Sequence, residues 1–238
     1  MRAGELLELW EQAGSLPPVE RALCLAGAAG GPVDQLRHRP VGQTHAYVLG
    51  LREAVLGGSL EATASCPRCG ARAEFEVQVA DLPTQPTGPA ELTDGDCLVR
   101  LQPPTPADLL DAAATVDPPA AERLLRGRCL SVVAGDGTPL ALERVAGEVL
   151  ERAEARLGEI DPLAEVLVEL SCPECGTAFH SDLDVTAFVW AELEARARRI
   201  LHEVDVLARC YGWTEPEVLD LSEPRRAAYL RLVLDGVA

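Results

Sequence analysis

The chain has 238 residues, of which 47% are hydrophobic, and this is enough for a buried core in one large domain or two smaller ones. Its formal net charge of −17 comes from 38 acidic and 21 basic residues, so its surface should repel phosphate backbones, and nucleic acid is not an expected partner. No apolar run approaches the ~20 residues that a membrane-spanning helix needs, and Glu5 stands where a secretory signal would be apolar, so we expect no membrane association and a cytoplasmic location.

The first part of the chain, residues 1–58, is predicted to be helical. Apolar residues recur at helical spacing over residues 5–13 and again over residues 42–56. Between them Pro18 opens a further short helix, and Gly57 supplies a stop for the last one.

Residues 59–82 predict a β-hairpin with a pair of cysteines at its tip. Residues 60–65 favour a strand, and the run Cys66-Pro-Arg-Cys69-Gly forms a tight turn. After this turn apolar and polar residues alternate, which is the period of a half-buried strand.

Residues 83–164 are predicted to form a helical insert with one short strand. The expected elements are, in order, a loop over 83–95 rich in Pro, Thr and Gly, a strand over 97–101, a helix capped by Thr105, a helix capped by Asp117, and an amphipathic helix over 142–157.

Residues 165–186 repeat the hairpin pattern, with Cys172-Pro-Glu-Cys175-Gly following Cys66-Pro-Arg-Cys69-Gly at an offset of 106 positions (66 to 172). The two hairpins are expected to face each other. The predicted fold class is therefore α+β, mainly helical, with two zinc-knuckle β-hairpins forming a split zinc ribbon around the helical insert.

Residues 187–238 are predicted to hold the C-terminal helices. The first of these is the longest helix of the chain and extends over about residues 185–210, so it starts just before this segment. Aromatic residues make up only 4% of the chain, yet two of them flank a glycine at the end of this helix. Since Trp, Tyr and Arg dominate binding hot spots, these positions are candidates for partner binding, and a small hydrophobic core is the alternative. The candidates are Trp190, Tyr211, Trp213, Arg225 and Arg226.

Two Cys-x-x-Cys pairs predict one Zn²⁺ bound by Cys66, Cys69, Cys172 and Cys175, because each pair supplies two corners of a tetrahedron. Four cysteine ligands leave no open position for water, so the site would be structural and not catalytic. Closing the long intervening loop costs about 4–5 kcal/mol, whereas a structural zinc supplies ~10 kcal/mol or more. Arg68 could offset the charge of the four thiolates, and so could Arg72.

Three other interpretations of the cysteine pairs are weaker. A degraded site that holds no metal is disfavoured because all four cysteines are intact. A thioredoxin-like redox pair would begin a helix, but strand-patterned sequence follows both pairs. Disulfides are disfavoured in a cytoplasmic chain. The other four cysteines stand singly in apolar segments and are expected to be small buried hydrophobes. They are Cys24, Cys97, Cys129 and Cys210.

No catalytic constellation is found in the sequence. The four histidines have no metal-ligand spacing, and no glycine-rich phosphate loop or nucleophile elbow is present. We therefore expect a protein that is not an enzyme and has no small-molecule substrate.

Several stretches, taken in order over about residues 40–235, resemble the baseplate (hub) assembly chaperone family of T-even phages, as found in gene clusters of bacterial contractile injection systems. The stretches are 41–58, Cys66-Pro-Arg-Cys-Gly, 99–101, 104–110, Cys172-Pro-Glu-Cys-Gly, Trp190-Ala-Glu192, 211–213, 221–222 and 225–230. The resemblance implies a non-enzymatic role in building the baseplate of a phage-tail-like particle, with baseplate or hub proteins as partners. It also implies zinc at the same four cysteines.

An alternative function is a zinc-ribbon binding module of nucleic-acid or transcription machinery. Such a module should gather arginines on the ribbon, and only Arg68 and Arg72 lie there. A thiol oxidoreductase is a third hypothesis, which metal content and thiol reactivity would separate from the other two.

Overall fold

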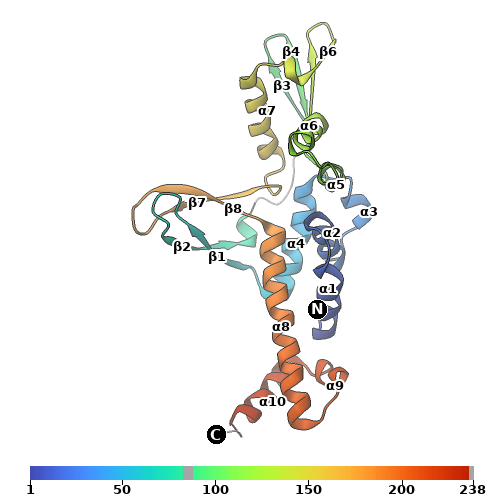
Figure 1. Cartoon of the computed structure of the whole chain (residues 1–238), viewed down its shortest axis with the longest axis vertical. Coiled ribbons are helices and arrows are strands. Elements are labelled where there is room, and N and C mark those ends of the chain that lie inside the picture. The colour runs from blue at the N-terminus through green and yellow to red at the C-terminus, as the bar shows by residue number, and fades with distance from the viewer. Residues whose placement is uncertain (83–87, 236–238) are drawn as a thin grey trace. The chain divides into compact units, whose positions relative to one another are not determined.

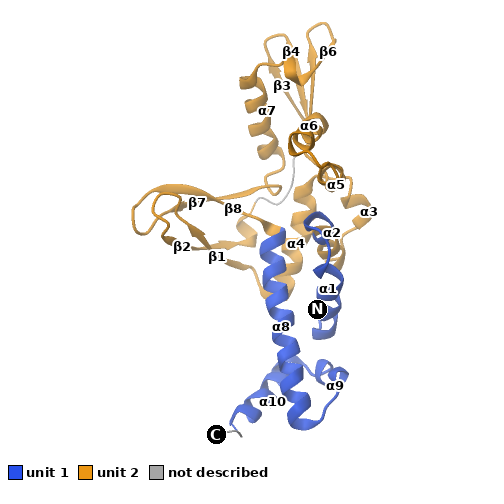
Figure 2. Ribbon diagram, in the orientation of Figure 1, with its two compact units in different colours: residues 1–21, 186–238 blue, residues 22–185 orange. Residues whose placement is uncertain are grey.

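The computed structural model describes residues 1–82 and 88–235 (Figure 1). It divides into two compact units, one of residues 1–21 and 186–238 and the other of residues 22–185 (Figure 2). The described residues form helices and small antiparallel sheets, which confirms the predicted α+β class. Within these residues, no helix combines the length and the apolar character needed to cross a bilayer.

The first unit is helical. It contains α1 (Ala3–Gly14), nearly all of α8 (Val185–Tyr211), α9 (Glu215–Leu219) and α10 (Glu223–Asp235). At the start of α9, Glu217 accepts hydrogen bonds from the Thr214 backbone N–H and hydroxyl, both at 2.8 Å. Such reciprocal capping satisfies N–H groups that the first turn leaves without partners.

The second unit begins with three helices. They are α2 (Pro18–Ala28, which crosses the boundary between the units), α3 (Val33–Leu36) and α4 (Val41–Leu56). The sequence predicts α2 and α4 but misses α3, because four residues are too few to show a helical period.

Two hairpins carry the cysteine pairs, as predicted. Strands β1 (Ser59–Ser65) and β2 (Arg72–Gln78) pair antiparallel, and so do β7 (Val166–Ser171) and β8 (Ala178–Leu183). A single 3₁₀ turn (η1, Val79–Asp81) follows β2.

The segment between the hairpins is corrected by the structure. It was predicted as helical with one short strand, but it holds a four-stranded antiparallel sheet in the order β3-β4-β5-β6. The predicted loop over 83–95 becomes strand β3 at its end, and its residues 83–87 lie outside the described part of the chain. The strands are β3 (Ala90–Asp94), β4 (Cys97–Leu101), β5 (Leu130–Ala134) and β6 (Pro139–Leu140).

The helices of this insert are α5 (Pro106–Ala113), α6 (Pro118–Cys129) and α7 (Gly147–Ile160). The predicted caps Thr105 and Asp117 both accept hydrogen bonds from helix N–H groups. The third helix begins five residues later than predicted, after a 3₁₀ turn (η2, Leu142–Arg144). One sheet face packs against α7 and forms the core of the insert. This core contains Val99, Leu101, Leu130, Val132, Val149, Ala153 and Ile160.

A buried carboxylate ties the end of the insert to α4. Asp161, which is 1% exposed, accepts a hydrogen bond of 3.0 Å from the backbone N–H of Gly42 in the first turn of α4. A β-carbon at position 42 would lie 2.0 Å from Asp161 Oδ1, so only glycine allows this approach. Asp161 therefore caps a helix whose own N-cap residue, Pro40, has no side-chain hydrogen bond to offer.

Candidate metal centre

The two cysteine turns have the same backbone structure. In the first, the N–H of Cys66 donates to the Ala71 carbonyl at 2.8 Å, and the N–H of Gly70 donates to the Cys66 carbonyl at 2.9 Å. The matching bonds in the second turn, from Cys172 to Thr177 and from Gly176 to Cys172, measure 2.9 and 3.0 Å.

Each turn ends on a glycine with positive φ, at +74° for Gly70 and +68° for Gly176. A side chain would strain this conformation, so the glycine closes the turn back onto its hairpin. The repeat seen in the sequence is thus a repeat of structure.

The four sulfurs of these turns form one cluster. All four Sγ atoms lie within 4.8 Å of one another. Across the hairpins, Cys66 Sγ is 3.7 Å from Cys175 Sγ, and Cys69 Sγ is 3.5 Å from Cys172 Sγ. Four sulfurs at 2.3 Å from a tetrahedral Zn²⁺ would be about 3.8 Å apart. The predicted ligand set is therefore brought together with a spacing that a metal ion can use.

The first cysteine of each pair lies inside and the second lies nearer the surface. Cys66 is 2% exposed and Cys172 is 3% exposed, whereas Cys69 is exposed and Cys175 is half-buried. The inner sulfurs pack in a small apolar cluster with Ala73 and Phe179, one from each hairpin. This cluster is too small to be a hydrophobic core by itself, so a bound ion would add much of the cohesion between the hairpins.

Hydrogen bonds favour the thiolate form of two of the four cysteines. Burial raises the pKa of Cys66, but hydrogen bonds from the backbone N–H groups of Cys69 and Arg68 outweigh it, and the pKa lies below its ordinary value. Hydrogen bonds with the hydroxyl and from the backbone N–H of Thr177 lower the pKa of Cys175 to about 6.

The sulfurs also share protons with one another. The backbone N–H of Ala71 favours the Cys69 thiolate, but hydrogen bonds with the Cys172 and Cys175 sulfurs favour its thiol, so the pKa of Cys69 is raised to about 12. A cluster that keeps part of its protons in this way releases them when a metal ion takes their place.

The two arginines near the cluster differ in which hairpin they contact. Arg68 Nη1 donates to Thr177 Oγ1 at 3.2 Å and so reaches from one knuckle to the other. Arg72, the second predicted charge partner, donates at 3.3 Å to Thr63 Oγ1 on its own hairpin. Thr177 was missed by the sequence analysis. Comparison of the two repeats could have found it, because it is the polar counterpart of Ala71.

The four single cysteines differ from one another. Cys129 is buried, as expected, and burial raises its pKa to about 11. Cys24 and Cys97 are half-buried, whereas Cys210 is exposed, which contradicts the prediction that it is a buried hydrophobe. None of them belongs to the sulfur cluster in the described residues.

Two of the five candidate partner-binding residues are buried, which leaves little of either side chain for contact with a partner. Trp190 is 9% exposed, and the Arg21 guanidinium lies 4.7 Å from the centre of its ring. Arg226 is 2% exposed and donates to Glu203 at 2.6 Å and to the Leu221 carbonyl at 3.3 Å. Both residues are explained by internal packing and internal ion pairing, which composition alone cannot reveal.

The other three candidates remain available at the surface to different degrees. Tyr211 stacks on Trp213 with ring centroids 4.8 Å apart, and both rings contact Tyr229. Tyr211 is 40% exposed, Trp213 is half-buried and Arg225 is exposed. The three rings therefore form a small hydrophobic cluster at the end of α8, as the alternative interpretation expects, and Tyr211 and Arg225 keep exposed area there.

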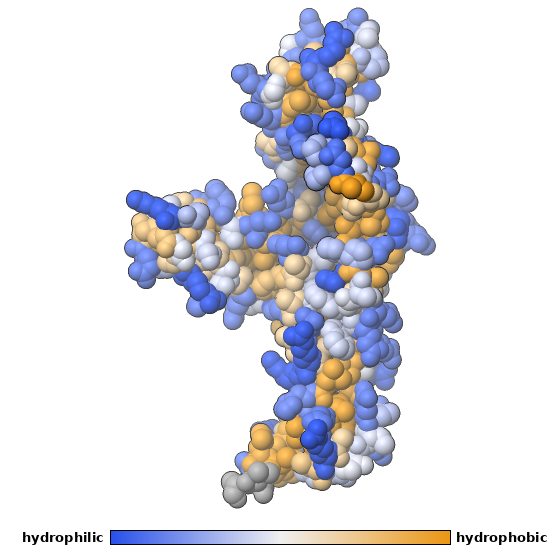
Figure 3. Space-filling model, viewed as in Figure 1, coloured by the Kyte–Doolittle hydropathy of each residue, from blue (hydrophilic) through white to orange (hydrophobic). Residues whose placement is uncertain are grey.

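Hydrophobic side chains also reach the surface at the end of α10 (Figure 3). There Leu232 is 61% exposed and Leu234 is 71% exposed.

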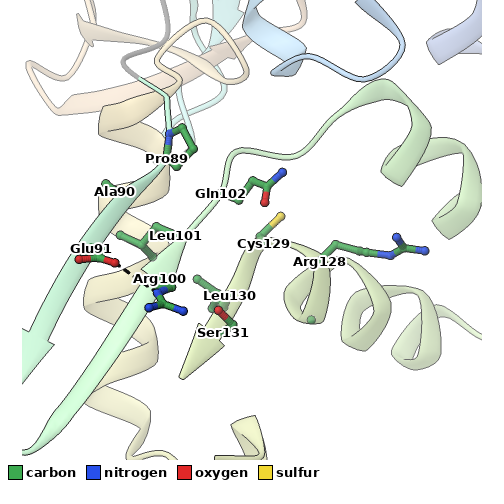
Figure 4. Close-up of a pocket in the computed structure, with 11 residues that line it drawn as sticks. Pro89, Ala90, Glu91, Arg100, Leu101, Gln102, Arg128, Cys129, Leu130 and Ser131 are labelled. Carbon is green, nitrogen blue, oxygen red and sulfur yellow. Dashed lines mark hydrogen bonds and ion pairs between the residues drawn. The ribbon is translucent and has the colours of Figure 1, made fainter. Parts of the chain in front are cut away.

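A groove of about 530 Å³ lies beside strands β3, β4 and β5 in the insert (Figure 4). Its polar residues include Arg100, which pairs with Glu91 at 3.2 Å, and Ser131. The Cys129 thiol at its edge has a raised pKa, so it stays protonated at neutral pH and is a weak nucleophile. The described lining residues thus place no activated nucleophile beside a base.

Comparison of the chain with protein-family models, with curated proteins and with solved structures finds no match.

Proposed function

We propose that Cys66, Cys69, Cys172 and Cys175 bind one structural Zn²⁺ ion. The observation that carries this proposal is the cluster of four sulfurs, all within 4.8 Å of one another, on two turns of matching backbone structure. A donor set of four thiolates suits Zn²⁺ and fills its tetrahedral shell, so the ion would hold structure and not activate water.

The ion would join two hairpins that are distant in sequence. The strands of the two hairpins belong to separate two-stranded sheets, and the small cluster around Ala73 and Phe179 supplies little buried area. An isolated two-stranded hairpin is marginally stable in water. Zinc binding of ~10–16 kcal/mol exceeds the loop-closure cost of about 4–5 kcal/mol, so the metal stabilises this arrangement.

We further propose that the chain is a non-enzymatic assembly chaperone or structural accessory protein for the baseplate of a contractile injection system. The support is the ordered resemblance of its motifs to that chaperone family. The expected partners are baseplate or hub proteins. The surface around Tyr211, Trp213 and Arg225 is the candidate contact, because it exposes aromatic and arginine side chains next to a rigid helix end.

The test is affinity capture of the tagged full chain from its native host, followed by mass spectrometry. Baseplate proteins should be recovered with the unaltered chain and reduced with a Tyr211→Ala, Arg225→Ala variant. A matched Leu201→Ala variant, altered at another exposed apolar position of α8, should capture them normally. Recovery of only ribosomal or polymerase subunits would instead favour the nucleic-acid module and contradict the assembly role.

A further inference from the structure

A hydrogen-bonded path crosses from the tip of the first knuckle to a sulfur of the second. Arg68 stands between the two cysteines of the first turn, and its Nη1 lies 3.2 Å from Thr177 Oγ1. The same Thr177 oxygen lies 3.3 Å from Cys175 Sγ. One hydroxyl therefore contacts both the guanidinium of one knuckle and a candidate metal ligand of the other.

The direction of the path follows from the chemistry of its groups. A metal-bound Cys175 is a thiolate and can only accept a hydrogen bond. Thr177 must then donate its single hydroxyl proton to the sulfur, which leaves its lone pairs free to accept from Arg68. Arg68 has donors only, so it can hold Thr177 in this orientation and no other.

The path has no counterpart in the other half of the repeat. Each outer sulfur receives the backbone N–H of the residue two positions later, namely Ala71 for Cys69 and Thr177 for Cys175. The alanine has no hydroxyl to add a second bond. The position that matches Arg68 in the second turn is Glu174, which has the opposite charge.

The positive charge of Arg68 is the reason why this path would favour a bound metal ion. One Zn²⁺ with four thiolates carries a charge of −2 in a chain whose net charge is already −17. A guanidinium that acts through a polarised hydroxyl stabilises this centre, and groups beyond the ligands typically change metal affinity 10–100-fold. Thr177 is half-buried and Arg68 is exposed, so solvent screening places the effect near the lower end of that range.

We propose that Arg68 and Thr177 form a relay that positions the Cys175 sulfur for the metal and couples metal binding to the contact between the two knuckles. The relay rests on the proposed zinc site. Arg68 and Thr177 are positioning residues, since neither of them binds the ion.

The test is metal binding by the full chain and its variants, using Co²⁺ as a spectroscopic probe and Zn²⁺ in competition with a chromophoric chelator. Thr177→Val should weaken Zn²⁺ binding about 10-fold and shift the sulfur-to-cobalt charge-transfer band to lower energy, because an unbonded thiolate gives up charge more easily. Thr177→Ser keeps the hydroxyl and should restore both properties.

The arginine variants test whether the two residues act in series. Arg68→Gln should weaken binding several-fold in the unaltered chain but have no further effect in a Thr177→Val background. Arg72→Gln is the matched control, because it removes the same charge from a residue bonded to Thr63, and it should leave the affinity within about 2-fold.

The outcomes separate the relay from the site on which it rests. If the unaltered chain shows no tetrahedral thiolate spectrum with Co²⁺, the zinc site itself is wrong, and the relay with it. If that spectrum is present but Thr177→Val leaves affinity and band position unchanged, the relay alone is overturned. Equal effects of Arg68→Gln and Arg72→Gln, or independent effects of Arg68→Gln and Thr177→Val, would also overturn it.

Discussion

Replacement of Cys172 by alanine should release the metal and loosen the two hairpins. Cys172 is 3% exposed, its sulfur lies 3.5 Å from that of Cys69, and it belongs to the apolar cluster between the hairpins. If four ligands share a binding free energy of ~10–16 kcal/mol, each contributes about 2.5–4 kcal/mol. Loss of one should weaken Zn²⁺ binding by about two to three orders of magnitude.

The same substitution also removes packing, so a matched control is needed. Cys129 is similarly buried, at 7% exposed, but lies in the core of the insert and outside the sulfur cluster. Cys129→Ala should therefore cost about 1–2 kcal/mol of stability and leave the zinc content unchanged.

The assays are zinc content by elemental mass spectrometry, affinity by competition with a chelator, and limited proteolysis of the region around residues 59–82 and 165–184. Cys172→Ala should lose stoichiometric zinc and become sensitive to protease there, whereas Cys129→Ala should not. Full zinc content and unchanged affinity in Cys172→Ala would show that Cys172 is not a zinc ligand.

Three further predictions concern the scaffold. Arg226→Met should lower the free energy of urea unfolding by about 3 kcal/mol, because it leaves Glu203, whose side chain is 16% exposed, without its partner. Arg225 is exposed, so Arg225→Met should change this free energy by less than about 0.5 kcal/mol, and equal effects of the two substitutions would contradict the buried ion pair. Gly42→Ala should destabilise the chain by about 2–4 kcal/mol in thermal unfolding, because the added β-carbon would displace Asp161. Gly50 lies in the same helix, and a β-carbon there would meet no atom within 4 Å, so Gly50→Ala should stabilise the chain by up to about 1 kcal/mol. Burial raises the pKa of Asp161 above 3.8 in spite of the Gly42 N–H and the charge of His45, so the contribution of this carboxyl group to stability is full at low pH and is lost as pH rises through the raised pKa. Over that rise the unaltered chain should therefore lose stability relative to Asp161→Asn. A stability difference between the two chains that does not change with pH would contradict this.

The sulfur cluster was predictable because its signal is local and doubled. Each Cys-Pro-x-Cys-Gly run encodes its own turn, with a glycine at the position of positive φ, and two such runs are what one tetrahedral site needs. The helix caps Thr105 and Asp117 were predictable for the same reason, since a cap acts within three residues of itself.

Of the four strands in the sheet of the insert only β4 was predicted, and the pairing that joins β4 to β5 is between distant segments of the chain. Strand β5 follows α6 directly at Leu130, with no turn residue to mark the change, and β6 has only two residues. The register that joins β4 to β5, with Val99 opposite Val132, is decided by burial against α7. Sequence periodicity over five residues does not carry that information.

Residue type was also a poor guide to which of the candidate side chains are exposed. Trp190 and Arg226 are the residue types that interfaces favour, but the same large, amphipathic side chains serve equally well inside a small helical unit. Only the exposed fraction of a side chain distinguishes a residue that packs inside the fold from one that can contact a partner. Gly42 and Asp161 form the opposite case, since nothing in the sequence links two residues so far apart, and yet they make one buried contact.

The proposed zinc site is tested most directly by X-ray absorption spectroscopy at the zinc edge on the purified full chain, combined with its metal content. We expect one zinc per chain, surrounded by four sulfur atoms at about 2.3 Å. A chain that carries no stoichiometric zinc, or one whose zinc has nitrogen or oxygen ligands in place of sulfur, would contradict it.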